Sequence, residues 1–95
     1  MTRQTVKEAL IGFGVDKKCI KEIAKTGLVV DIKGTGPATS TKLNKVKTLA
    51  LRADMDGLPM PENNKSLPYA SKTSFAHMCG HDGHMACLLA AASVL

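Results

Sequence analysis

The final stretch of the chain restricts the possible folds more than any other segment. Residues 83–95 predict a helix, and its side chains are apolar on almost every face. Such a helix is stable only when other elements cover it on several sides. The chain has 95 residues and only three aromatic side chains to supply that cover. Because a chain of this size buries little more than about 60% of its unfolded surface, we expect the helix to belong to a larger core.

An amphipathic helix is predicted over residues 2–13. Val6, Leu10 and Phe13 recur at three- and four-residue spacing, which places them on one helical face. Thr2 is the expected N-cap, and the glycines on either side of Phe13 predict the end of the helix.

A β-hairpin is expected next. Residues 19–24 and 28–32 carry the branched apolar side chains that are typical of strands, and the residues around Gly27 have turn chemistry. Residues 34–47 are polar and predict a loop. This loop contains Gly-x-Gly, but no helix follows it, so we do not expect it to bind phosphate.

The centre of the chain predicts a buried strand. Residues 48–53 are apolar on both faces, as the central strand of a covered sheet is. The connection over residues 57–76 contains three prolines, and connections of this length are uncommon unless they are functional. Together the elements predict an α/β fold with an N-terminal helix, a hairpin, a central strand and a buried C-terminal helix.

Two aspartates follow the predicted central strand. Asp54 and Asp56 are two residues apart, so in an extended chain their side chains point the same way. Ligands of open α/β sheets bind at the carboxyl ends of the strands, which makes this pair a candidate site. The alternative is that both carboxylates only end the strand and cap the turn at Gly57.

A cluster of metal-binding residue types precedes the C-terminal helix. Four donors lie within eight residues: His77, Cys79, His81 and His84. Thiolate and imidazole groups suit Zn²⁺, Mn²⁺, Ni²⁺ or Co²⁺. The spacing lacks the paired cysteines of closed structural zinc sites, so we expect an incomplete catalytic site that other ligands complete. His84 is interpreted either as a ligand or as a residue that supports the ligands or contacts the substrate.

The two remaining cysteines, Cys19 and Cys87, are interpreted as inert packing residues. Three cysteines cannot all pair with one another, and no secretory signal follows Met1. We therefore expect a reducing, cytoplasmic location. The longest apolar run is much shorter than a membrane span, so no membrane partner is expected.

Positive charge is concentrated in the first half of the chain. Residues 1–50 hold ten Lys or Arg and four Asp or Glu, and the whole chain has a net charge of +5. A basic half is typical of proteins that bind polyanions. The lysines are scattered, however, and aromatic residues that could stack on bases are few. We therefore expect a solvated surface rather than a nucleic-acid interface.

The two candidate segments together carry a resemblance to a known family. They read Arg-Ala-Asp-Met-Asp-Gly-Leu-Pro over residues 52–59 and His-Met-Cys-Gly-His-Asp-Gly-His-Met-Ala over residues 77–86. In residues, order and separation they resemble the N-acyl-amino-acid amidohydrolases, which include hippurate hydrolases and plant hydrolases of indole-3-acetyl–amino-acid conjugates. This family is a branch of the two-metal aminopeptidase and carboxypeptidase superfamily. The resemblance implies that residues 1–95 are the N-terminal portion of one catalytic domain with three α/β/α layers.

The resemblance also implies a role for each polar residue of the two segments. Cys79 and His81 match the first two metal ligands of the family. Asp56 matches the aspartate that supports the metal site, and it is the residue we expect to act in catalysis. Asp54 lies where relatives often have a ligating histidine. Asp54, Asp82 and His84 are expected to support the ligands or to contact the substrate.

The sequence departs from the family pattern in two small respects and one large one. Gly57 and Met78 stand where the family usually has alanine. The resemblance further implies that the general-base glutamate and the remaining ligands lie beyond Leu95. Glu62 lies in the wrong segment to replace that glutamate, so we expect no turnover by these 95 residues alone.

The implied activity is the metal-dependent hydrolysis of the amide bond of N-acyl amino acids, with two divalent ions in the complete site. The complete enzyme is expected to take a small substrate and to form a homodimer through an inserted domain. Two alternatives belong to other classes. One is a metal-binding or interaction module without catalysis, and the other is a basic protein that binds nucleic acid in a salt-dependent way.

Overall fold

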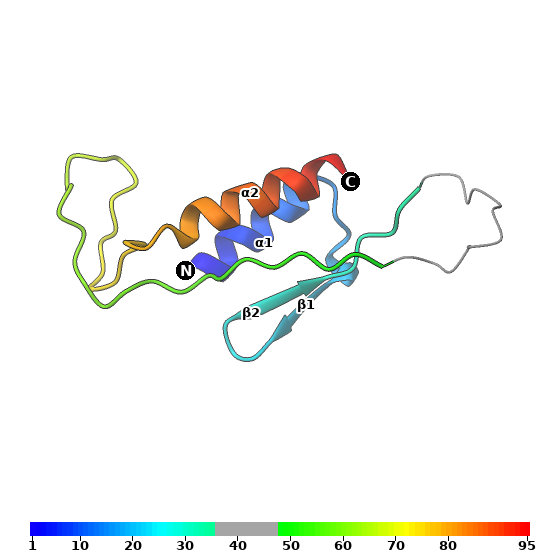
Figure 1. Cartoon of the computed structure of the whole chain (residues 1–95), viewed down its shortest axis with the longest axis horizontal. Coiled ribbons are helices and arrows are strands. Elements are labelled where there is room, and N and C mark those ends of the chain that lie inside the picture. The colour runs from blue at the N-terminus through cyan, green and yellow to red at the C-terminus, as the bar shows by residue number, and fades with distance from the viewer. Residues whose placement is uncertain (36–47) are drawn as a thin grey trace.

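The computed structural model describes residues 1–35 and 48–95. Within these ranges the elements follow one another in chain order: α1 (Thr2–Gly12), the 3-10 turn η1 (Lys17–Cys19), β1 (Ile20–Ile23), β2 (Gly27–Val30) and α2 (His81–Val94) (Figure 1). The expected α/β composition is confirmed, because helices and an antiparallel sheet are both present. The arrangement in three layers stays a prediction.

The N-terminal helix is confirmed, with a difference at its first residue. α1 spans Thr2–Gly12, and its N-cap is Met1, without a hydrogen bond from any capping side chain. Thr2 is therefore the first residue inside the helix, and the prediction that it caps the helix is wrong. The end agrees with the sequence, because Gly14 takes a left-handed φ of 93° directly after the last turn.

The predicted hairpin is also confirmed, since β1 and β2 pair antiparallel. Its turn lies over residues 24–26, and Ala24 and Lys25 take left-handed φ angles of 47° and 63°. Such angles are costly for residues that carry a Cβ atom. The guanidinium group of Arg3 donates a hydrogen bond of 2.5 Å to the carbonyl oxygen of Lys25. This bond ties the turn to α1.

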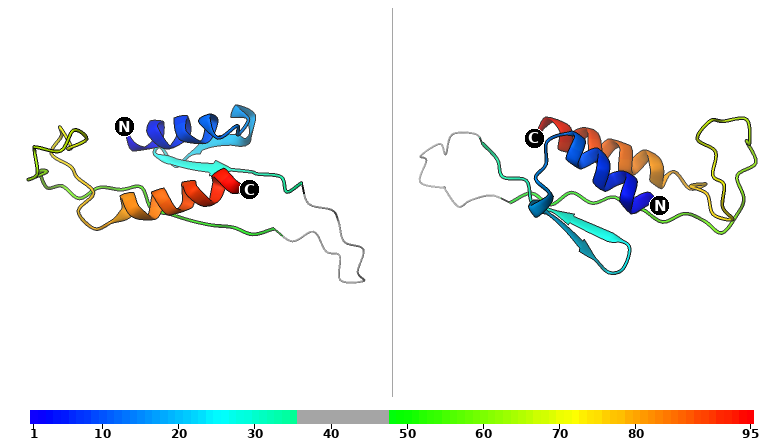
Figure 2. Two further views of the ribbon diagram at one scale, coloured as in Figure 1. Left: turned by 90° about the horizontal axis from the view of Figure 1, so that it is seen from above. Right: turned by 180° about the vertical axis from the view of Figure 1, so that it is seen from behind.

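The two helices lie side by side and run in the same direction (Figure 1 and Figure 2). α1 packs against both α2 and β2. The buried apolar residues of the described part of the chain are Leu10, Ile20, Ala76 and Met85. They come from α1, β1, the long connection and α2, so no single element supplies the small amount of buried apolar surface.

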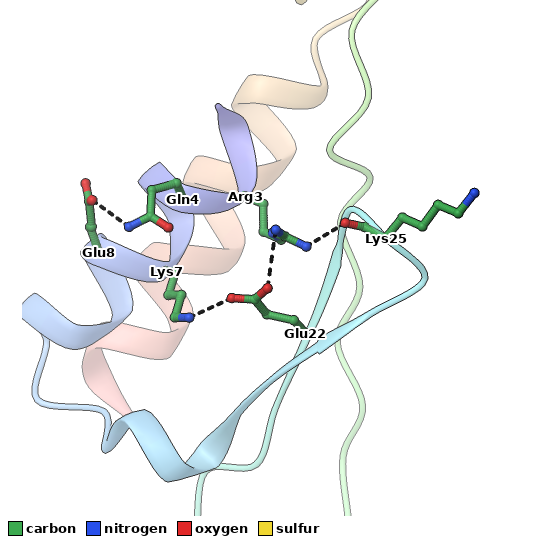
Figure 3. A network of polar contacts seen from close by, with 6 residues as sticks. All are labelled: Arg3, Gln4, Lys7, Glu8, Glu22 and Lys25. Carbon is green, nitrogen blue, oxygen red and sulfur yellow. Dashed lines mark hydrogen bonds and ion pairs between the residues drawn. The ribbon is translucent and has the colours of Figure 1, made fainter.

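An exposed ionic cluster fixes α1 on the hairpin (Figure 3). Lys7 Nζ donates a hydrogen bond of 2.6 Å to Glu22 Oε1, and Arg3 Nη2 lies 3.2 Å from Glu22 Oε2. The hydrogen bond from Lys7 and the positive charges of Arg3 and Lys7 hold the pKa of Glu22 below its usual value. Because solvent screens exposed ion pairs, the cluster orients α1 more than it stabilises the fold.

The predicted central strand does not form in the part of the chain that the structure describes, so that prediction is wrong. Residues 48–53 are extended, but they pair with no described neighbour, and Leu49 and Leu51 are 79% and 52% exposed. A strand needs a partner for its backbone N–H and C=O groups, and the described residues offer none here. The loop predicted over residues 34–47 lies outside the described residues from position 36 onward.

The C-terminal helix differs from expectation in its start and in its burial. α2 begins at His81 instead of Gly83, and Met85 is its only buried residue. Val94 is 84% exposed. Among the described elements α1 covers one side of α2, so the predicted burial on several sides is not found there.

The molecule is elongated. Its Cα radius of gyration is 16.6 Å, and its principal extents are 56, 25 and 23 Å. A compact chain of this length has a radius of gyration of about 12 Å. None of the described helices combines the length and the apolar character that crossing a membrane requires.

Candidate metal centre

A single backbone bridge brings the two polar segments together. Leu58 and Ala76 form an antiparallel bridge, in which Leu58 N donates to Ala76 O at 2.9 Å and Ala76 N donates to Leu58 O at 3.1 Å. The backbones are so close that a Cβ atom at Gly57 would lie 3.3 Å from the Ala76 oxygen. The bridge therefore places the residues before Leu58 beside the residues after Ala76.

Asp56 and His81 meet next to this bridge. Asp56 Oδ1 lies 2.8 Å from His81 Nδ1, an ion pair when the imidazole is protonated. The alignment of the two groups is too poor for a hydrogen bond, and Nδ1 is a buried atom without a hydrogen-bond partner. The Asp56 side chain remains 68% exposed, whereas that of His81 is 22% exposed. A buried, unsatisfied imidazole nitrogen is unusual, and it makes this pair the centre of the candidate site.

The start of α2 determines where the remaining donors lie. Gly80 is the N-cap and takes a left-handed conformation, with φ 90° and ψ 11°. The chain turns sharply there, so exposed Cys79 stays outside the helix while His81 becomes its first residue. Asp82 is an exposed acidic residue in the first turn, where it interacts favourably with the helix dipole.

The structure brings together only some of the predicted site residues. The ring of His84 lies beside that of His81, with 5.8 Å between the ring centroids. Asp54 pairs with Arg52, whose Nη2 donates a hydrogen bond of 2.7 Å to Asp54 Oδ1. Within residues 1–35 and 48–95, no group of three or more His, Cys, Asp or Glu side chains is placed to hold a metal ion.

The donors therefore fit a metal ion as part of a site. The orphaned His81 nitrogen and the adjacent Asp56 carboxylate are groups that metal centres use. Of this pair His81 is the candidate ligand and Asp56 the group beside its ring. A catalytic zinc site takes three protein ligands, so ligands besides His81 are needed.

A hollow of about 550 Å³ opens beside Asp56. It is lined by the first residues of α1, the hairpin turn and residues 53–56. Asp54 and Asp56 both line it, but so do Ala53 and Met55, so the lining does not test whether the two aspartate side chains point the same way. Because residues 48–53 form no strand among the described residues, the choice between a site at a strand end and two carboxylates that only cap the turn at Gly57 stays open.

The two other cysteines differ from each other. Cys19 is half-buried at the end of η1, in line with a packing role, whereas Cys87 is exposed on α2. The packing prediction for Cys87 is therefore wrong. Within residues 1–35 and 48–95 nothing buries the part of α2 that carries Cys87.

One residue of the cluster has a contact that sequence reasoning did not assign. His77 Nδ1 lies 3.0 Å from the carbonyl oxygen of Asp56, and His77 Nε2 lies 3.4 Å from Thr2 Oγ1. The sequence indicated His77 only as one of four possible metal donors in the cluster. Its contacts depend on the bridge between Leu58 and Ala76, which no local pattern predicts.

The sequence of the segment that carries this site matches a known protein family. Residues 50–95 match the model of peptidase family M20/M25/M40. Together with the curated relatives described next, this match shows that the chain belongs to that family. The matching residues include both aspartates, the backbone bridge and α2, so they contain all of the candidate metal centre. No solved structure matches the chain significantly.

Curated relatives match beyond these residues. The hippurate hydrolase of Campylobacter jejuni is 43% identical over 95 residues, which cover 99% of this chain and 22% of the relative. The N-acetyl-L-cysteine deacetylase of Bacillus subtilis is 46% identical over 90 residues, which cover 83% of the chain and 19% of the relative. The N-acyl-L-amino acid amidohydrolase of Geobacillus stearothermophilus is 37% identical over 94 residues, which cover 98% of this chain and 22% of the relative. The chain thus spans about a fifth of the length of the M20 relatives it matches.

Replacing Gly80 by alanine tests the turn that separates Cys79 from His81. A Cβ atom meets nothing within 4 Å at this position, so the cost arises from the left-handed φ alone. We expect Gly80→Ala to lower the free energy of unfolding by about 1–2 kcal/mol, measured by urea denaturation followed by circular dichroism.

Gly83→Ala is the matched control, because Gly83 lies inside α2 and also has open space around it. Alanine favours a helix over glycine, so this change is expected to raise the free energy of unfolding by about 0.5–1 kcal/mol. Equal effects of the two substitutions would contradict the assigned turn.

Proposed function

We propose that the chain supplies part of the metal site of an enzyme that hydrolyses the amide bond of N-acyl amino acids. One observation carries this proposal: Asp56 Oδ1 lies 2.8 Å from a buried His81 nitrogen that lacks a hydrogen-bond partner. A histidine that binds metal through one ring nitrogen usually presents the other to a carboxylate or carbonyl group. Membership of the M20 family and the names of the three relatives support the reaction type.

The proposal gives each donor a separate task. His81 binds the metal through Nε2, because Nδ1 faces Asp56. Cys79 supplies a thiolate from the turn just before α2. Asp56 orients the imidazole ring of His81. When bound, a divalent ion supplies Lewis-acid chemistry, which polarises the scissile carbonyl group and makes water more acidic. Zn²⁺, Mn²⁺, Ni²⁺ and Co²⁺ suit these donors, and we propose two ions in the complete site.

Three polar residues have supporting tasks in the proposal. Asp54 lines the hollow while Arg52 neutralises its charge, so we assign it to the substrate side. Exposed Asp82 stabilises the start of α2. His84 packs against the ring of His81 and either restrains that ring or contacts the substrate. The general base and the remaining ligands come from residues other than those described.

The proposed partners follow from the same reasoning. The substrate is a small N-acyl amino acid, and we propose a cytoplasmic homodimer without a nucleic-acid or membrane partner. The three free cysteines support a reducing location. Scattered lysines and few aromatic residues argue against base recognition.

A chimera tests the proposed function. In Campylobacter jejuni hippurate hydrolase, the segment that aligns with this chain is exchanged for the chain itself. Since identity is 43% over 95 residues, we expect the chimera to fold and to hydrolyse hippurate when Zn²⁺ or Mn²⁺ is supplied, measured by release of the amino acid.

The matched control is the same chimera with His81→Ala, for which we expect loss of activity with the fold retained. A folded chimera without activity would contradict the proposed function. So would a chimera whose activity is insensitive to His81→Ala. The 95-residue chain alone is expected to show no turnover.

A further inference from the structure

We infer that His77 is a positioning residue that holds the main chain of Asp56, so that the Asp56 carboxylate faces His81. The inference rests on the proposed function, because it names the residue that builds the proposed metal site. The contact that carries it is the 3.0 Å approach of His77 Nδ1 to the carbonyl oxygen of Asp56.

The contact replaces a missing backbone hydrogen bond. Leu58 and Ala76 exchange both of their backbone hydrogen bonds, so in an antiparallel ladder the next hydrogen-bonded pair would be Asp56 and Met78. Met78 N instead donates to Ala76 O at 3.0 Å and closes a three-residue turn. The Asp56 carbonyl oxygen therefore loses its ladder partner, and the imidazole of His77 occupies the vacant donor position.

The replacement is needed where the chain changes direction. After Ala76 the backbone leaves the pairing, closes the turn at Met78, turns again at Gly80 and enters α2 at His81. A ladder extended to Met78 would carry the chain away from this turn. With His77 as the donor, the Asp56 segment stays attached while the backbone turns, so Asp56 and His81 reach each other at 2.8 Å.

The second ring nitrogen ties this arrangement to α1. His77 Nε2 lies 3.4 Å from Thr2 Oγ1. A carbonyl oxygen only accepts hydrogen bonds, so Nδ1 must carry a proton, and the neutral ring then accepts from the Thr2 hydroxyl group through Nε2. The contacts therefore specify the Nδ1–H tautomer of His77, which is a property that a merely space-filling histidine would lack.

Nuclear magnetic resonance of the 95-residue chain tests the tautomer directly. Long-range proton–nitrogen correlations of the histidine rings, recorded at a pH where the rings are neutral, are expected to place the His77 proton on Nδ1. A proton on Nε2, or rapid exchange between the two tautomers, would overturn the inference.

Two substitutions separate the donor from the bulk of the ring. Asparagine places an N–H donor near the position of Nδ1, whereas glutamine places one near Nε2. We expect His77→Asn to preserve the Asp56 and His81 chemical shifts and His77→Gln to change them. Titration with Zn²⁺ alone should give an affinity within about 3-fold of wild type for His77→Asn and about 10-fold weaker for His77→Gln.

The outcomes keep the two proposals apart. Equal behaviour of His77→Asn and His77→Gln in the Asp56 and His81 shifts would overturn the role of His77. The wild-type chain can show the expected His77 tautomer while the chimera that contains it is folded but inactive. In that case the proposed function fails, but the contact between His77 and Asp56 stands.

Discussion

Replacing His81 by alanine is expected to lower the affinity of the chain for Zn²⁺ by on the order of 100-fold or more, since changes even behind metal ligands cost about 10–100-fold. The substitution removes the imidazole that pairs with Asp56 at 2.8 Å. Cys79→Ser should have a comparable effect, because a hydroxyl group is a much poorer zinc ligand than a thiolate. Metal content measured by mass spectrometry and the binding isotherm together give the result.

The chain provides a control of the same chemistry for the cysteine. Cys87 is also exposed, but it lies beyond the first turn of α2, so Cys87→Ser should bind Zn²⁺ as wild type does. His84→Ala distinguishes the two open roles of His84. If His84 is a metal ligand, this variant should lose affinity for Zn²⁺ as His81→Ala does. Unchanged zinc stoichiometry in both His81→Ala and Cys79→Ser would refute the ligand assignment.

Leu10→Ala is expected to lower the free energy of unfolding by about 2–4 kcal/mol. Leu10 is 5% exposed and is the buried residue of α1, and with so few buried residues the core has little capacity to close the resulting cavity. Since small domains are stable by only about 5–15 kcal/mol, a large share of the folded population should be lost. Urea denaturation followed by circular dichroism measures the change.

Leu49→Ala removes the same atoms at a position that is 79% exposed. Surface substitutions usually change stability by less than about 0.5 kcal/mol, so Leu49→Ala should unfold at nearly the wild-type urea concentration. A similar loss in both variants would contradict the burial assigned to Leu10, or would indicate that residues 48–53 are covered in solution.

The local part of the fold was predictable from sequence. The spacing of Val6, Leu10 and Phe13 predicted α1, and the residues around Gly27 predicted the hairpin, because both elements depend on contacts between near neighbours. The central strand failed for the opposite reason. The apolar pattern over residues 48–53 indicates which side chains a strand there would bury. A strand also needs a partner strand from a distant part of the chain, and the described residues contain none for this segment.

The candidate site was predicted in its residues and only partly in its geometry. Asp54 and Asp56 line one hollow together with the residues between and before them, so their spacing is not tested, whereas Asp56 does meet His81. Asp54 pairs with Arg52 instead, because the arginine is two residues away in the same extended segment. The grouping of Cys79 with other donors stays a prediction. The contact of His77 was not predictable, because it arises where the backbone pairing stops after Ala76.

The bridge between Leu58 and Ala76 has a consequence for sequence change. It closes residues 59–75 into a loop that projects away from the helices (Figure 1). For a flexible loop with fixed ends, doubling the length adds only about 0.6 kcal/mol of closure entropy. Insertions near exposed Asn63 and Asn64 should therefore be tolerated thermodynamically. Such a loop can diversify during evolution, or carry an engineered label, while the distance between Asp56 and His81 is preserved.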